Sequence, residues 1–142
     1  MRMDNHSEFN KKKNVSLTKL FFYLSNVLLF IFYLFPGSLL GCFLFNNCKI
    51  QPYLTPDFIV SSNHVYIFIV VSLLGLASYS KKKISKKIIV YLFFLSVFLE
   101  FTHLINPERG FEIKDLAGNI VGVVISLVIF LIFKFRKKNE QF

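Results

Sequence analysis

Apolar and polar residues occupy long separate blocks along this chain. Four apolar runs cover 18–38, 58–79, 88–105 and 116–133. The runs are apolar on all sides and carry no stripe at the helical period, so length and hydropathy identify them. About 20 helical residues, rising about 1.5 Å each, cross a bilayer core about 30 Å thick. The pattern predicts an all-α membrane protein with four transmembrane helices.

Polar segments separate the four runs. Residues 46–57 contain two prolines and little hydrophobic pattern, which is typical of a connecting loop. Residues 81–87 read KKKISKK and are predicted to form a hairpin with five lysines. Residues 106–115 begin Asn-Pro-Glu-Arg-Gly, which breaks the apolar pattern. We expect this last segment to form a short polar loop between the third and fourth helices.

The basic residues are distributed unevenly between these segments. The chain has 17 Lys and Arg against 8 Asp and Glu, and 14 of the 17 lie in 1–19, 81–87 and 134–142. Short basic flanks stay in the cytoplasm when helices insert. We therefore predict a multi-pass protein of the cell (plasma) membrane with both termini cytoplasmic and with the loops at 46–57 and 104–115 facing outward.

Composition limits the remaining classes of protein. With 54% hydrophobic residues in 142, too little polar sequence is left to cover a soluble domain. We predict a basic cytoplasmic N-terminus (1–19), one four-helix transmembrane domain (20–133) and a basic cytoplasmic tail (134–142). The basic segments then contact membrane lipids, and nucleic acid is not an expected partner because no soluble domain presents them.

Two cysteines lie near the end of the first apolar run. Leu39-Leu40-Gly41-Cys42 resembles a lipoprotein cleavage site, but the basic segment before it is long, Leu40 is large, and three further apolar runs follow. We therefore interpret Cys42 as a small apolar residue at the outer end of the first helix. Cys48 lies in the outer loop, where oxidation can occur, so a Cys42–Cys48 bridge stays open as an alternative.

Polar side chains gather at the predicted outer ends of the helices, and we treat them as one candidate site. Glu100 and His103 lie three residues apart and share a helix face. A carboxylate one turn below the interface costs about 2–3 kcal/mol in lipid, so Glu100 needs a partner inside the bundle, either Arg109 or His64. We call the following set the polar cluster: His64, Glu100, His103, Arg109, Asp115 and Asn119.

The beginning of the fourth run suggests a helix N-cap and a helix face that packs closely against another helix. Asp115 is predicted to precede the helix and to cap its free N–H groups. Asn119, Gly122 and Ser126 follow on the same face. Gly118 and Gly122 form a pair of small residues four apart, which favours close approach of another helix.

Known catalytic and metal-binding patterns are missing from the sequence. His64, His103 and Glu100 provide only two histidines and one carboxylate, and the cysteines lack the spacing of metal ligands. We find no nucleophile elbow, phosphate-binding loop or HExxH motif. We therefore predict no cofactor, no metal and no catalytic residue. An alternative is that Glu100 only closes a salt bridge with Arg109 that holds the outer loop.

Three segments resemble the VanZ-like family of small bacterial membrane proteins. They are LFPG at 34–37, SSNHVYIF at 61–68 and LEFTHLINPERGFEIKDLAGNIVGVVIS at 99–126. The family usually has Gln at the position of His103, and an acidic residue is common near Asn63. The positions that match the family pattern are His64, Glu100, Pro107, Arg109, Asp115, Asn119 and Gly122.

The resemblance implies a protein of the bacterial cell envelope. The family takes its name from a protein that lowers sensitivity to teicoplanin-type glycopeptide antibiotics. We expect a non-enzymatic membrane protein whose polar cluster engages a lipid-linked envelope precursor or a glycopeptide. The alternative is a small membrane enzyme or lipid-handling protein that uses Glu100 or His64 as an acid-base group. A third interpretation is that the cluster only joins the outer ends of the helices.

Overall fold

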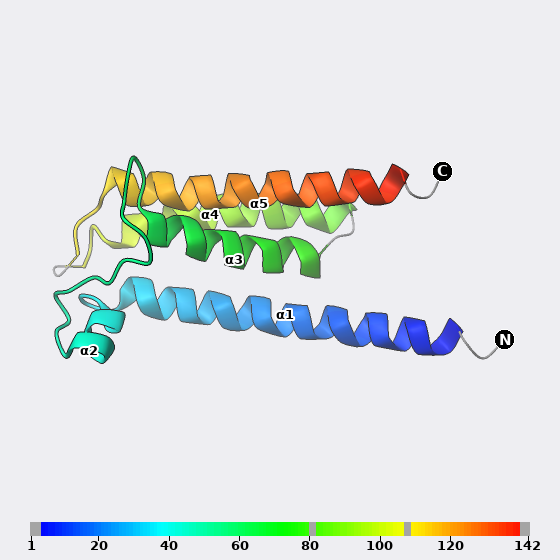
Figure 1. Cartoon of the computed structure of the whole chain (residues 1–142), viewed down its shortest axis with the longest axis horizontal. Helices are drawn as coiled ribbons and strands as arrows, with labels where there is room; N and C mark the ends of the chain where they lie inside the picture. The colour runs from blue at the N-terminus through cyan, green and yellow to red at the C-terminus, as the bar shows by residue number, and fades with distance from the viewer. Residues whose placement is uncertain (1–3, 80–81, 107–108, 140–142) are drawn as a thin grey trace.

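The computed structural model describes residues 4–79, 82–106 and 109–139, and within them helices are the only regular secondary structure. The long helices α1, α3, α4 and α5 run lengthwise beside one another, and the short α2 lies at one end with the loops (Figure 1). The beginning of α1 and the end of α5 lie at the opposite end (Figure 1). The helices are α1 (Asp4–Leu34), α2 (Leu39–Phe45), α3 (Ser62–Ser78), α4 (Lys82–Thr102) and α5 (Ile113–Asn139).

Two helices in the described part of the chain are long and apolar enough to cross a membrane. They are Leu17–Leu34 within α1 and Ile113–Arg136 within α5. Helix α3, Ser62–Ser78, is apolar but shorter. Many large apolar side chains on α1 and α5 face outward, including Leu20 and Phe133. These two helices and their exposed apolar surfaces are consistent with a membrane protein.

The first helix ends earlier than the apolar run predicts. We expected a single helix over 18–38, but α1 stops at Leu34 and a separate α2 begins at Leu39. Pro36 lacks a backbone N–H and disfavours the helical conformation in the residue before it. Gly37 then adopts a φ of 82°, which is readily accessible to glycine. The Pro-Gly pair therefore turns the chain at the end of α1.

The predicted hairpin at 81–87 is wrong. The lysine-rich sequence is helical from Lys82, where α4 begins; position 81 lies outside the described residues. Lysine has a good helix propensity, so a run of lysines does not end a helix by itself. Helix α5 likewise continues to Asn139, through most of the predicted basic tail.

A disulfide links Cys42 of α2 to Cys48 of the following loop. The sequence left a Cys42–Cys48 bridge open as an alternative, and the structure contains it. The interpretation of Cys42 as a simple apolar residue is therefore wrong. Next to it, the backbone N–H of Ser38 donates to the carbonyl of Cys48 at 2.7 Å. The bridge and this hydrogen bond fix α2 and its loop at the end of the bundle where the polar cluster lies.

Helices α3 and α5 make the closest contact in the bundle. A Cβ at Gly118 would lie 2.7 Å from the carbonyl oxygen of Ser61, and one at Gly122 would lie 2.6 Å from that of Val65. Farther along, the Ser126 hydroxyl donates to the carbonyl of Ile69 at 3.1 Å. The missing side chains of the two glycines let the backbones approach closely, which sets the register of one helix against the other.

The glycine contact gives a stability prediction. Replacing Gly122 with Val would force side-chain atoms into the backbone of α3, and overpacking of this kind costs about 1–3 kcal/mol. We expect the free energy of unfolding of the protein purified in mild detergent to fall by that amount. Gly110→Val is the control, because a Cβ at Gly110 would meet no atom within 4 Å. Equal stability of the two variants would contradict the close packing of α3 on α5.

Candidate functional site

One buried amide joins all four long helices. Asn119 in α5 is 0% exposed. Its Nδ2 donates to the carbonyl of Ser96 in α4 at 3.0 Å. Its Oδ1 accepts from the hydroxyl of Tyr33 in α1 at 2.7 Å and lies 2.9 Å from Nδ1 of His64 in α3. The polar end of the bundle is therefore built around Asn119.

The contacts of Asn119 determine the protonation of the His64 ring. Because the Ser96 carbonyl can only accept, the amide nitrogen of Asn119 must face it, and the amide oxygen faces His64. The Tyr33 hydroxyl also lies 2.8 Å from Nδ1 of His64, but it donates its proton to the Asn119 oxygen. Both neighbours of Nδ1 therefore accept hydrogen bonds, so Nδ1 carries a proton. Nε2 of His64 then lies 3.3 Å from Oδ2 of Asp115. The histidine is held in one orientation between two side chains of α5.

Asp115 lies inside the first turn of α5, so the prediction that it precedes the helix as a cap is wrong. The carbonyl of Glu112 accepts from the N–H groups of Asp115 and Leu116 at 3.1 Å each, so the helix begins before Asp115. The carboxylate still lies near the positive end of the helix dipole. Its Oδ2 lies 3.3 Å from Nε2 of His64.

Glu100 is fully buried, at 0% exposure, and is only half satisfied. Its Oε1 accepts from the backbone N–H of Glu112 at 3.1 Å and lies 3.3 Å from Nδ1 of His103. Its Oε2 has no hydrogen-bond partner among the described residues, and neither has Nε2 of His103. The ring of His103 stacks on Tyr33, with centroids 5.2 Å apart. A buried carboxylate oxygen without a partner is costly and requires an explanation.

Arg109 does not pair with Glu100, so the alternative in which a salt bridge between them holds the outer loop is wrong. Its Nε and Nη2 both donate to the carbonyl of Gly37, at 2.9 and 2.6 Å. The turn at Pro36 and Gly37 makes this carbonyl available. Burial lowers the pKa of the Arg109 guanidinium, while the negative charges of Asp115 and Glu100 oppose that shift. Arg109 thus ties the loop after α4 to the turn after α1.

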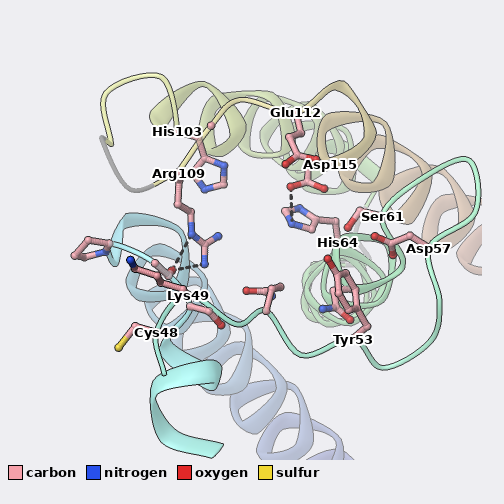
Figure 2. A pocket seen from close by; sticks show the side chains of 16 residues that line it. Cys48, Lys49, Tyr53, Asp57, Ser61, His64, His103, Arg109, Glu112 and Asp115 are labelled. Carbon is pink, nitrogen blue, oxygen red and sulfur yellow. Dashed lines mark hydrogen bonds and ion pairs between the residues drawn. The ribbon is translucent and has the colours of Figure 1, made fainter. Parts of the chain in front are cut away.

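A polar cavity of about 720 Å³ opens at this end of the protein. Figure 2 shows side chains from helix ends and loops around it, with Arg109 and His64 reaching toward it from opposite sides. The sequence did not indicate several lining residues, because loop residues have no periodic pattern that places them. The additional lining residues with polar or charged side chains include Lys49, Gln51, Tyr53, Asp57, Asn63 and Glu112.

A second cavity of about 520 Å³ lies beside the first and is mainly apolar. Its apolar walls come from α1, α2, the following loop and α3. Tyr53, His64 and Arg109 line both cavities. Its apolar lining residues include Phe32, Leu39, Leu40, Leu44, Leu54, Ile67 and Val70. The two cavities share lining residues, so a polar space lies next to an apolar one.

The structure divides the polar cluster into three parts. His64 contacts both Asp115 and Asn119. Glu100 and His103 contact each other. Arg109 bonds to the backbone and lines the cavities.

Three residues of the cluster could hold a metal ion. One donor atom from each of His64, Glu100 and Asp115 lies within 4.8 Å of the other two. The sequence analysis missed Tyr33, since an aromatic residue in an apolar run gives no separate signal.

Comparison with known protein families gives a match. The sequence model of a family described as VanZ/LLP1 matches residues 2–134. No curated protein and no solved structure matches the chain. The match covers nearly the whole chain, including every residue of the polar cluster.

Proposed function

The chain belongs to the VanZ-like family, and we propose that it is a non-enzymatic integral membrane protein of the bacterial cell envelope that binds an amphiphilic envelope ligand. Helices α1, α3, α4 and α5 cross the membrane in this proposal, and the cavities open on the outer face. The ligand is a lipid-linked cell-wall precursor. Its binding lowers the sensitivity of the cell to teicoplanin-type glycopeptides.

The distribution of charge supports the orientation. The beginning of α1, the end of α3, the beginning of α4 and the end of α5 lie at one end of the bundle (Figure 1). These helix ends belong to the sequence segments 1–19, 81–87 and 134–142, which contain 14 of the 17 Lys and Arg residues. Basic flanks are retained in the cytoplasm, so this end is inside. The disulfide between Cys42 and Cys48 lies at the other end, and disulfides persist in oxidising surroundings outside the cytoplasm.

The junction of the two cavities is the observation that supports the ligand class. An amphiphile places its headgroup among charged and hydroxyl groups and its hydrocarbon chain against apolar side chains. The polar cavity has cations at Lys49 and Arg109 and carboxylates at Asp57, Glu112 and Asp115. Because Arg109 lines both cavities, it lies where the headgroup of the ligand meets its chain.

The orientation predicts a pattern of thiol labelling. In a Cys42→Ser, Cys48→Ser background, an Ile59→Cys variant should react with a membrane-impermeant maleimide added to whole cells, since Ile59 lies exposed in the loop before α3. A Lys86→Cys variant, exposed near the beginning of α4, should react only after the cells are permeabilised. Labelling of Lys86→Cys in intact cells, with Ile59→Cys protected, would invert the orientation.

The proposed ligand predicts a specific loss on removing Arg109. Charge-assisted hydrogen bonds contribute about 1.5–3 kcal/mol, so Arg109→Ala should weaken binding of a polyprenyl-linked cell-wall precursor to the detergent-purified protein about tenfold or more. Expression of the wild type in a susceptible host should raise the inhibitory concentration of teicoplanin, and expression of Arg109→Ala should not.

Two further variants keep this test specific. Arg136→Ala removes an exposed arginine at the opposite end of the protein and should bind as the wild type does. Lys49→Ala removes an exposed cation of the cavity without touching the contact to Gly37, so it should weaken binding with an unchanged thermal midpoint. The proposal fails if the wild-type protein binds no precursor, or if Arg136→Ala loses as much affinity as Arg109→Ala.

A further inference from the structure

We propose that His64, Glu100 and Asp115 form a binding site for a divalent transition-metal ion. The three residues come from α3, α4 and α5, and one donor atom of each lies within 4.8 Å of the other two. The proposal rests on these contacts and does not depend on the ligand proposed above. Two observations, on the histidine and on the glutamate, point to a cation at this place.

The first observation is the orientation of His64. Its protonated Nδ1 faces the Asn119 amide oxygen at 2.9 Å, which leaves the lone pair of Nε2 directed toward Asp115. When the ring is neutral, Nε2 of His64 and Oδ2 of Asp115 both accept hydrogen bonds, and they lie 3.3 Å apart. A cation bound to both removes that conflict. Metal-binding histidines almost always donate their other N–H to an acceptor in this way, and Asn119 supplies it.

The second observation is the unpaired oxygen of Glu100. This side chain is 0% exposed, and its Oε2 has no hydrogen-bond partner among the described residues. Its other oxygen is held by the backbone N–H of Glu112 at 3.1 Å, which fixes the carboxylate in place. Burying a charged oxygen without a partner is expensive, and a bound cation offsets that cost. Arg109 does not do so, because its hydrogen bonds go to Gly37.

The donor set indicates the class of metal. One imidazole nitrogen and two carboxylate oxygens suit Zn²⁺ or Mn²⁺, and no free thiol is present to bind a softer ion. Metal–ligand distances of about 2.0–2.2 Å place tetrahedral donor atoms about 3.4 Å apart. The donor atoms of the three residues lie up to 4.8 Å apart, so binding would bring the most distant two closer by up to about 1.4 Å. His64 and Asp115 line the polar cavity, so the remaining coordination position faces it. Water or a group of the bound ligand can take that position.

Metal binding by the purified full chain tests the proposal. The protein in detergent is treated with a chelator, freed of it, and titrated separately with Zn²⁺ and Mn²⁺ by calorimetry. We expect one ion per chain at this site for at least one metal. His64→Gln and Asp115→Asn should each weaken binding at least about tenfold, since even outer-shell changes cost about 10–100-fold.

Glu112→Gln is the matched control. It removes a carboxylate from the wall of the same cavity but lies outside the donor set and keeps the backbone N–H that holds Glu100. The metal affinity of this variant should therefore stay within about threefold of the wild-type affinity. The proposal is wrong if the wild type binds neither ion, or if Asp115→Asn and Glu112→Gln bind equally. If neither ion binds, a proton on Nε2 of His64 takes the place of the metal, and the resulting imidazolium pairs with Asp115.

X-ray absorption of the zinc-loaded wild type makes the test independent of how well the variants fold. It should show nitrogen and oxygen ligands at about 2.0–2.2 Å with the scattering of one imidazole. A spectrum without imidazole scattering would overturn the assignment. Neither the titration nor the X-ray absorption uses the lipid-linked precursor. Failure of the metal site can therefore be distinguished from failure of the proposed envelope ligand.

Discussion

The side chain of Asn119 is the contact on which this end of the protein depends. It donates to α4 through the Ser96 carbonyl, accepts from Tyr33 of α1 and faces the His64 ring of α3. Buried polar groups must be hydrogen-bonded, and Asn119 satisfies this requirement with one partner on each of the other long helices. This amide therefore fixes the relative register of the helices, and the close approach at Gly118 and Gly122 places it against α3.

The cavities and the proposed metal site follow from that arrangement. Asn119 contacts Nδ1 of His64, so Nε2 on the other side of the ring faces Asp115, and His64 lines the polar cavity. The disulfide of α2 and the hydrogen bonds of Arg109 to Gly37 hold the loops that form the rest of the cavity wall. A rigid interior network beneath loops fixed in this way is suited to binding, because little has to be ordered when a ligand enters.

The sequence predicted the helical class and the family, because long apolar blocks and a few characteristic polar residues are local features. It did not predict where helices end. Pro36 and Gly37 divided an apolar run that looked continuous, and the lysines from Lys82 began a helix where a hairpin was expected. Of the two partners that it offered for Glu100, Arg109 is wrong. Arg109 is near in sequence, but Gly37, more than sixty positions earlier, takes its hydrogen bonds, and such pairings depend on tertiary packing.

A double-mutant cycle between α1 and α5 tests the central role of Asn119 most directly. The free energies of unfolding of Tyr33→Phe, Asn119→Ala and the double variant are compared with that of the wild type in the same detergent. The 2.7 Å hydrogen bond between the two side chains predicts a favourable coupling of about 0.5–3 kcal/mol. Tyr91→Phe, whose hydroxyl bonds to Asn26 instead, should show no coupling to Asn119→Ala. A Tyr33–Asn119 coupling as small as this control would contradict the account.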